Sequence, residues 1–288
     1  MTKQTTTQKR LAAVRERMRA AGLDALLVSN PENRQYITGF YGHDSGQDSA
    51  GRVLITQDHI ALMTDMRYSE QAHEEAPGVE IIDKREKLTV LVNERLDEWG
   101  WPRGKTGATK PVLGIEANHL TVSLCDALRT ASRSRFRIKP TTEIVEPLRA
   151  QKDKEEIELT RRATDITCQT FDHLLEYLKQ PGLTEQQVVA ESVTTMLRLG
   201  ADSVAFAAIV AGGPNGARPH AMPGDRVLEP YAPIIIDMGA RVHGYCADMT
   251  RTVFLDGVPD VWAERYHHVL AAQEACEAGL RAGISGKV

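Results

Sequence analysis

The stretch that decides the fold contains two apolar, strand-like parts punctuated by glycine and proline. It reads VAFAAIVAGGPNGARPHAMPGDRVL over residues 204–228 and APIIIDMGARVHGYCADMTRTVFLDG over residues 232–257. In the second part, Pro233–Ile236 and Tyr245–Phe254 have the composition of strands, and Gly239 and Gly244 lie between them. Since glycine allows the chain to reverse, we expect these two runs to pair as antiparallel strands.

Two carboxylates stand on this predicted hairpin. Asp237 ends the first apolar run, and Asp248 follows eleven residues later on the second run. Two neighbouring buried carboxylates repel each other unless a cation compensates them. Carboxylate ligands favour Mn, Mg, Co or Zn, as one ion or as a pair about 3.5–4 Å apart. In the alternative interpretation, Asp237 caps a turn and Asp248 forms a surface ion pair with Arg251.

His220 lies upstream of the hairpin, in a loop that two prolines stiffen, Arg218–Pro223. A rigid loop is a suitable mount for a catalytic imidazole that binds substrate, although a loop histidine can equally be a surface residue. The preceding Gly212–Gly216 fits a turn. It is not a phosphate-binding loop, because no GxxxxGK[ST] pattern is present.

Composition and charge exclude several classes of protein. The chain has 288 residues, 42% hydrophobic and 26% charged, which suits about two globular domains of roughly 150 residues each. A net charge of −4 argues against a generally basic nucleic-acid binder. No apolar run approaches the roughly 18 residues of a membrane helix, and the polar start lacks the core of a secretion signal. We therefore expect a cytoplasmic protein that binds neither nucleic acid nor membrane.

The four cysteines are widely spaced and form no CxxC pair. This spacing excludes a disulfide scaffold and a structural zinc site, and it predicts isolated buried thiols.

The rest of the chain predicts two domains. Before residue 140, helical and strand-like segments alternate, as in an open α/β domain. The segments are helices at 9–21, 88–99 and 121–132, and strands at 23–29, 52–56, 59–64, 79–83 and 112–116. A proline-bracketed boundary follows, and then a charged helix over Asp153–Lys179 and a second helix from Thr184 to about Leu199. A last helix is predicted over about Pro259–Arg281.

The order of these pieces resembles the proline-specific metallopeptidases of the pita-bread fold, the Xaa-Pro dipeptidases (prolidases) and Xaa-Pro aminopeptidases. The central likeness is IVAGGPNGARPHAMPGDRVL followed by IIIDMGARVHGYCADMTRTVF. Tyr36–Phe40 (YITGF) resembles an element of the creatinase-like N-terminal domain, and Lys152–Ile157 resembles the charged start of the catalytic domain. The resemblance implies an α/β protein: a creatinase-like N-terminal domain at 1–146, followed by the first part of a pita-bread (α+β) catalytic domain at 147–288.

The same resemblance implies a site with two divalent metal ions, with Mn²⁺ expected first and Co²⁺ or Zn²⁺ as alternatives. Asp237 would bind one metal ion and Asp248 would bridge both. His220 would be a catalytic residue that hydrogen-bonds the substrate near the scissile carbonyl.

Further residues correspond to supporting positions. Thr250 and Arg251 would contact the metal ligands and hold them in position without binding the metal, and Tyr245 would shape the pocket. Tyr41 and His43 follow the YITGF element and are candidate substrate-binding residues on a loop that approaches an active site across a homodimer.

The family has five metal ligands in the order Asp, Asp, His, Glu, Glu, and this chain contains only the first two. His267 and His268 are the only later histidines and lie within a predicted helix. We therefore expect a truncated metallopeptidase with weak or absent metal binding and no activity of its own.

The implied activity of the parent protein is metal-dependent exopeptidase hydrolysis of the bond before proline, in Xaa-Pro dipeptides or at the N-terminus of longer peptides. Two alternatives stay open. One is a creatinase-like, metal-free amidinohydrolase, and the other is a non-catalytic, peptidase-like binding module.

Overall fold

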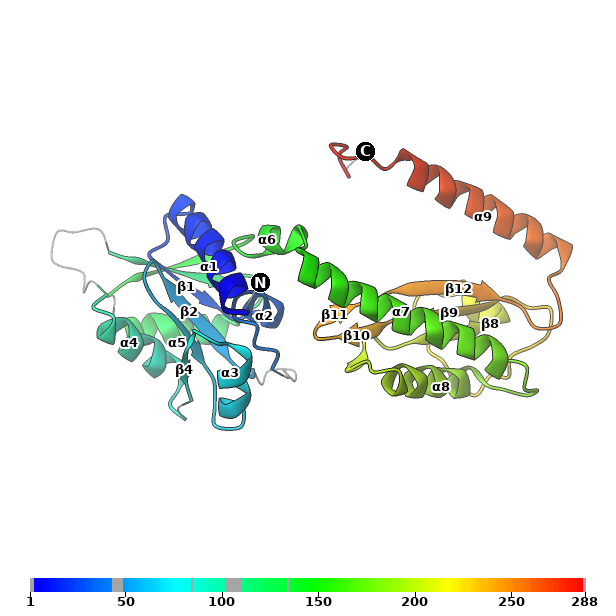
Figure 1. Ribbon diagram of the computed structural model, residues 1–288, viewed down its shortest axis with the longest axis horizontal. Coiled ribbons are helices and arrows are strands. Elements are labelled where there is room, and N and C mark those ends of the chain that lie inside the picture. The colour runs from blue at the N-terminus through cyan, green and yellow to red at the C-terminus, as the bar shows by residue number, and fades with distance from the viewer. Residues whose placement is uncertain (1–2, 43–48, 84, 102–109, 134, 287–288) are drawn as a thin grey trace. The chain divides into compact units, whose positions relative to one another are not determined.

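The computed structural model describes residues 3–42, 49–83, 85–101, 110–133 and 135–286. The chain forms two compact units, Met1–Lys152 and Asp153–Val288 (Figure 1). The division lies after the predicted limit at residue 146, because the short helix α6 (Glu146–Ala150) contacts α1 (Lys3–Ala20) of the first unit.

The first unit is built on a mixed six-stranded sheet of order β4-β3-β2-β1-β5-β6. Its strands are β1 (Ala25–Val28), β2 (Arg52–Thr56), β3 (Ile60–Met63), β4 (Glu80–Ile82), β5 (Val112–Glu116) and β6 (Arg137–Thr141). Strand β1 runs antiparallel to β2 and parallel to β5. The pairing of Ile55 with Ile60 joins the two strands predicted at 52–56 and 59–64 in a hairpin around Gln57-Asp58.

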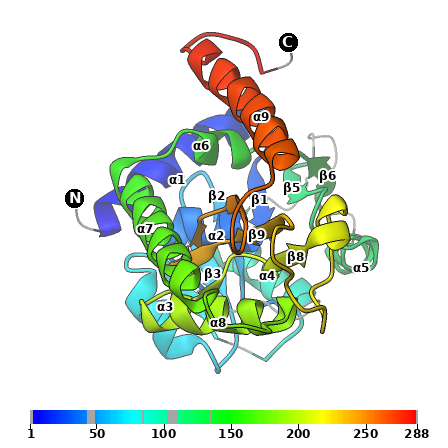
Figure 2. The ribbon, with the colours of Figure 1, turned by 90° about the vertical axis from the view of Figure 1, so that its right-hand side faces the viewer.

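Helices cover both faces of this sheet (Figures 1 and 2). They are α1, α2 (Pro31–Thr38), α3 (Ser69–Glu75), α4 (Leu88–Glu98) and α5 (Val122–Ser132). Alternate residues of β1 face opposite sides, as a strand requires. Leu26 shares a buried cluster with Val14 of α1, whereas Leu27 shares another with Leu96 of α4 and Leu128 of α5. The predicted α/β domain is therefore a sheet with a buried core on each face.

Helix α2 was not predicted, and local capping explains it. The Asn30 side chain accepts a hydrogen bond from Asn33 N, and Pro31 occupies the first turn. Gly39 ends the helix with a φ of 85°, a left-handed conformation that glycine adopts without strain. The YITGF element is thus the last turn of α2, its C-cap and the buried Phe40.

The second unit packs helices α7 (Lys154–Tyr177) and α8 (Glu185–Arg198) on two three-stranded sheets, ordered β12-β9-β8 and β11-β10-β7. The strands are β7 (Ser203–Val204), β8 (Ile209–Gly212), β9 (Ile234–Met238), β10 (Ala240–Val242), β11 (Tyr245–Cys246) and β12 (Met249–Val253). A 3-10 helix, η1 (Gly213–Ala217), follows β8. Helix α9 (Asp260–Gly279) has no buried residue. The structure confirms the three helices predicted for this half.

All four cysteines are free thiols, as expected, but only Cys125 is buried. The prediction of burial is wrong for Cys168, Cys246 and Cys276, because each lies on an outward-facing position of its helix or strand. Among the described residues, no helix combines the length and the apolar character needed to cross a membrane.

Candidate active site

The segment from Ile234 to Val253 is one long hairpin. Strands β9 and β12 pair antiparallel, with Asp237 opposite Thr250. Nearer the turn, β10 and β11 continue in the same register, with Val242 opposite Tyr245. The antiparallel pairing that the apolar runs predicted is confirmed.

The two glycines of this hairpin have different roles. The chain reverses at His243 and Gly244, whose φ angles of 45° and 82° follow the pattern of a type I′ turn. Gly239 does not reverse the chain, so that part of our prediction is wrong. A Cβ atom at Gly239 would lie 1.8 Å from the carbonyl oxygen of Ala247, so glycine is required there for close strand approach.

The register places the two carboxylates on the same face of the hairpin. Since Thr250 pairs with Asp237 and Met249 with Met238, the next residue, Asp248, lies opposite Gly239. Asp237 and Gly239 are two residues apart and share a face, which makes Asp237 and Asp248 diagonal neighbours. Such neighbours are about 7–8 Å apart at Cα, within reach of a shared cation or cation pair.

The contacts of these carboxylates leave room for a cation. Thr250 Oγ1 donates a 2.9 Å hydrogen bond to Asp237 Oδ1, while the exposed Asp248 carboxylate makes no hydrogen bond to a described residue. The alternative surface pair between Asp248 and Arg251 does not form, because Arg251 Nη1 instead donates to the carbonyl oxygen of Thr250 at 2.9 Å.

The donor set fits part of a metal site. Carboxylate oxygens on one face suit a hard divalent cation. Within the described ranges, however, no group of three or more His, Cys, Asp or Glu side chains is arranged to hold a metal ion. His267 and His268 are exposed on α9. Asp237 and Asp248 could therefore supply two carboxylates to a metal site, and their role as metal ligands stays a prediction.

His220 is exposed, on the loop that follows β8 and η1. Strand β8 lies next to β9: its first residue, Ile209, pairs with Asp237, and its last residue, Gly212, from which the chain continues toward His220, pairs with Ile234. Backbone hydrogen bonds from Arg218 N to Asn215 O (3.0 Å) and from Ala221 N to Arg218 O (3.2 Å) bracket the histidine. The imidazole makes no hydrogen bond to a residue that the structure describes.

Tyr245 connects the hairpin to the start of helix α7. Its hydroxyl donates a 3.0 Å hydrogen bond to Glu156 Oε1, and Glu156 is buried. Glu156 also completes a capping box with Asp153. The charged start of α7 thus anchors the aromatic residue that precedes the second carboxylate.

Tyr41 belongs to the first unit, where its backbone N–H donates to Glu75 Oε2 (2.7 Å) and its carbonyl accepts from Gln71 Nε2 (2.9 Å). His43 lies outside the described residues. The predicted approach of this loop to an active site across a homodimer stays a prediction.

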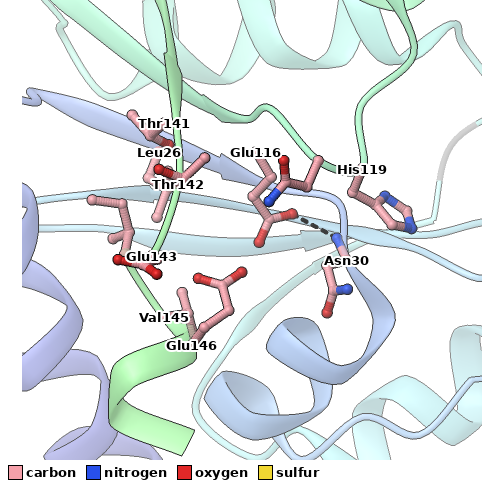
Figure 3. Close-up of a pocket in the computed structure, with 11 residues that line it drawn as sticks. Leu26, Asn30, Glu116, His119, Thr141, Thr142, Glu143, Val145 and Glu146 are labelled. Atoms are coloured by element: carbon pink, nitrogen blue, oxygen red, sulfur yellow. Dashed lines mark hydrogen bonds between the residues drawn. The ribbon is translucent and has the colours of Figure 1, made fainter. Parts of the chain in front are cut away.

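The first unit also contains a cavity of about 50 Å³ at the carboxyl ends of β1, β5 and β6 (Figure 3). The buried Glu116 carboxylate on its wall accepts from Ser29 N (2.5 Å), Asn30 N (2.6 Å) and Asn33 Nδ2 (2.7 Å). Asn33 also donates to Glu146 Oε1 at 2.8 Å. These bonds join two strand ends to α2 and α6, which is a structural role.

Sequence reasoning missed two buried glutamates beside the candidate site, Glu156 and Glu185. Both stand in the first turn of a helix, Glu156 as the capping-box partner of Asp153 and Glu185 directly after the N-cap Thr184, where an acidic residue is ordinary. One feature of the sequence could have drawn attention to Glu185. The capping box of this helix is formed by Thr184 and Gln187, so Glu185 is not needed for the helix cap and could have another role.

Comparison with known proteins agrees with this architecture. The creatinase/prolidase N-terminal domain matches residues 10–151, and metallopeptidase family M24 matches residues 158–288. The uncharacterized peptidase YqhT of Bacillus subtilis is 35% identical over 266 residues, which are 92% of this chain and 70% of that protein. This chain belongs to metallopeptidase family M24.

Solved relatives of this M24 chain have the same fold. An Xaa-Pro dipeptidase from Bacillus anthracis is 32% identical with a TM-score of 0.86, covering 97% of this chain and 74% of that one. An X-Pro aminopeptidase from Thermotoga maritima is 28% identical with a TM-score of 0.77, covering 90% and 70%. The comparisons confirm the predicted fold class, a creatinase-type N-terminal domain followed by M24 pita-bread sequence. The expectation that only the first part of the pita-bread domain is present stays a prediction.

Proposed function

We propose that this protein is a metal-dependent exopeptidase that hydrolyses the peptide bond before proline. The observation that carries the proposal is the hairpin register, which sets Asp237 and Asp248 as diagonal neighbours on one face. Family membership and the relatives named as Xaa-Pro peptidases support it. The proposed domain limit, near residue 146, leaves the hairpin entirely in the catalytic part.

The residues of this chain would divide the work as follows. Asp237 and Asp248 would hold the divalent metal, and the Thr250 hydroxyl would orient the Asp237 carboxylate. His220 would donate a hydrogen bond to the substrate beside the scissile carbonyl. When bound, the metal supplies Lewis acidity that polarises this carbonyl. Because proline has no N–H, the enzyme must recognise its ring by shape rather than by a backbone hydrogen bond.

We further propose that residues 1–288 by themselves do not hydrolyse Xaa-Pro substrates. They contribute two carboxylates where the family uses five ligands. Two carboxylates hold a divalent cation weakly, so the pair of metals would need donors beyond Asp237 and Asp248. Mn²⁺ is the first metal to test, with Co²⁺ and Zn²⁺ beside it.

A chimera tests this function. Residues 1–288 are followed, after Val288, by the part of the Bacillus anthracis Xaa-Pro dipeptidase that this chain does not cover; we call this protein the completed chimera. We expect the completed chimera to hydrolyse Ala-Pro and Leu-Pro with Mn²⁺, and not Ala-Gly. Its Asp237→Asn variant and residues 1–288 alone should be inactive. A folded, Mn²⁺-loaded chimera that leaves both Ala-Pro and a longer Ala-Pro peptide such as Ala-Pro-Gly intact would contradict the proposal, and hydrolysis by residues 1–288 alone would contradict the predicted inactivity.

A further inference from the structure

Glu185, the first residue of α8, is buried against the segment that carries His220. Its side chain is 1% exposed. Oε1 accepts hydrogen bonds from Gly212 N (2.9 Å) and Asn215 Nδ2 (3.0 Å). Oε2 accepts from Asn215 Nδ2 (3.0 Å) and Gly224 N (3.2 Å). A single carboxylate therefore binds two residues near the beginning of segment 212–224 and the residue at its end.

Backbone hydrogen bonds extend this connection toward the histidine. Asn215, held by Glu185, accepts through its carbonyl from Arg218 N, and the Arg218 carbonyl accepts from Ala221 N. Ala221 is buried, whereas the adjacent His220 is exposed. On the far side, Gln186 N donates to Gly224 O at 3.1 Å. The residues on both sides of His220 are thus fixed to the start of α8.

The helix itself does not require this buried charge. Thr184 and Gln187 form the capping box of α8 without it. Burying a carboxylate is costly unless hydrogen bonds satisfy it, and the nearest cation, Arg226, is half-exposed with its Nε 3.9 Å from Oε1. A carboxylate is nevertheless suited to this position, because its two oxygens only accept hydrogen bonds and three donor groups converge on them.

We propose that Glu185 is the positioning residue of the candidate active site and fixes the backbone around His220 by holding segment 212–224. The inference rests on the proposed function, since the role of His220 belongs to that proposal. The holding contact itself exists in the metal-free chain. It is therefore measurable without hydrolysis, and its failure is distinguishable from failure of the peptidase assignment.

The test uses residues 1–288 labelled with ¹³C at histidine Cε1, with the His220 signal assigned from its loss in His220→Gln. In Glu185→Gln, an NH₂ group replaces one of the two accepting oxygens and faces N–H donors. The hydrogen bond from either Gly212 N or Gly224 N is therefore lost. We expect the His220 signal to shift or split. Amide hydrogen exchange over residues 212–224 should accelerate about tenfold or more, while exchange over residues 234–253 changes less than about twofold.

Glu191→Gln is the matched control on the same helix. Glu191 Oε1 lies 2.7 Å from His173 Nε2, so this variant should move the His173 signal and leave the His220 signal in place. The double variant Glu185→Gln/Asn215→Asp reverses donor and acceptor within the pair. Because one glycine N–H stays unpaired in this variant, exchange over 212–224 should be slower than in Glu185→Gln but still faster than in the parent.

Three results would overturn the proposal. The first is an unchanged His220 signal and unchanged exchange in Glu185→Gln. The second is equal acceleration in every segment, which would make Glu185 a general stabiliser. The third is no recovery in the double variant. If Glu185→Gln does not fold, Asn215→Ala replaces it, with the same loop-limited acceleration expected and the same results counting against the proposal.

Discussion

Asp237 and Thr250 face each other across strands β9 and β12, and Thr250 Oγ1 donates a 2.9 Å hydrogen bond to Asp237 Oδ1. Among the described residues, Oδ2 of Asp237 receives no hydrogen bond. The threonine therefore orients the carboxylate and leaves one oxygen available to a cation. A hydrogen bond behind a ligand of this kind sets the ligand's direction and basicity.

Removal of the threonine hydroxyl should weaken metal binding while the strand stays intact. In the completed chimera, Thr250→Val should lower Mn²⁺ affinity about tenfold, because Asp237 loses its orienting bond. Free Mn²⁺ is measured by electron paramagnetic resonance during titration. Thr252→Val, on the same strand opposite Ile235, is the control and should bind like the parent. Equal affinity of the Thr250 variant and the parent would argue that the hydroxyl has no such role.

Gly239 should tolerate no side chain. In Gly239→Ala the new Cβ would lie 1.8 Å from Ala247 O, so the hairpin must open, at a cost of more than about 3 kcal/mol in the free energy of unfolding. Gly224→Ala is the matched control, since nothing lies within 4 Å of its Cβ. It should stay within about 0.5 kcal/mol of the parent in urea unfolding. Similar losses in both variants would show that steric contact is not the cause.

The hairpin could be predicted because its apolar runs, its glycines and the spacing of its carboxylates are all local features. The purpose of Gly239 could not be predicted, because it depends on how closely the backbone of Ala247 approaches it. Helix α2 was missed, although its cap Asn30 and Pro31 were visible, because Asn-Pro also ends strands. Glu185 was missed for a different reason. Its partners Gly212, Asn215 and Gly224 are distant in sequence, and only folding shows that they share one carboxylate.

The polar network of the first unit should be sensitive to loss of one acceptor. In Glu116→Gln, an amide N–H replaces an oxygen that faces the donors Ser29 N and Asn30 N, or Asn33 Nδ2. Figure 3 shows the bond from Asn30 N. Unfolding should become easier by about 1–3 kcal/mol. Glu143→Gln alters an exposed residue of the same cavity and should change stability by less than about 0.5 kcal/mol. The comparison is made by urea unfolding, and a stable Glu116 variant would contradict the structural role.

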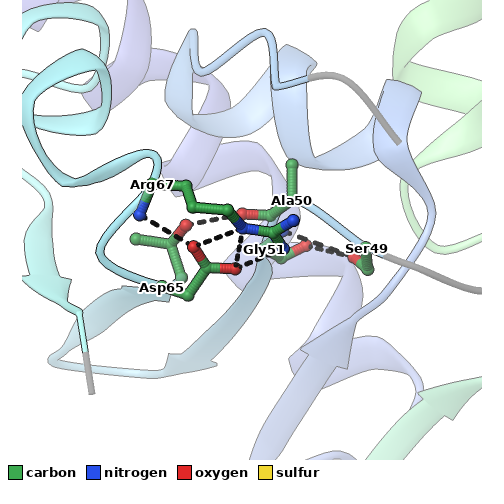
Figure 4. Close-up of polar contacts among 6 residues, drawn as sticks. Ser49, Ala50, Gly51, Asp65 and Arg67 are labelled. Carbon is green, nitrogen blue, oxygen red and sulfur yellow. Dashed lines mark hydrogen bonds and ion pairs between the residues drawn. The ribbon is translucent and has the colours of Figure 1, made fainter. Parts of the chain in front are cut away.

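Acid should remove the contribution of the Asp65–Arg67 ion pair to the free energy of unfolding (Figure 4). Arg67 Nε and Nη2 donate to the two carboxylate oxygens at 3.0 and 2.8 Å, and these side-chain hydrogen bonds lower the pKa of Asp65 below its ordinary 3.8. Because the pKa is lower in the folded state, the stabilisation is present above pH 3.8 and is lost as the pH falls through the folded pKa.

The measurement is the unfolding free energy of the parent and Arg67→Gln as a function of pH. The difference between them should be small, because the pair is largely exposed, and it should shrink below pH 3.8. Arg67 also lies over the Tyr68 ring, a contact that does not depend on pH, so some difference should remain in acid. Arg67→Lys keeps the positive charge but loses the two parallel N–H donors of the guanidinium. Its free energy of unfolding should lie between those of the parent and Arg67→Gln. A difference that is constant across pH would contradict the Asp65 assignment.

We expect Asp237 and Asp248 together to hold a divalent metal ion. Mn²⁺ bound there would broaden the amide signals of nearby residues in the spectrum of residues 1–288, and this paramagnetic broadening detects even weak binding. We predict selective broadening around residues 237–239 and 248–250, lost in Asp237→Asn and in Asp248→Asn. The broadening should be kept in Asp256→Asn. Asp256 is an exposed carboxylate with a positive φ, and asparagine also adopts a positive φ readily. Broadening that is spread evenly over the chain, or that survives in both hairpin variants, would contradict the claim.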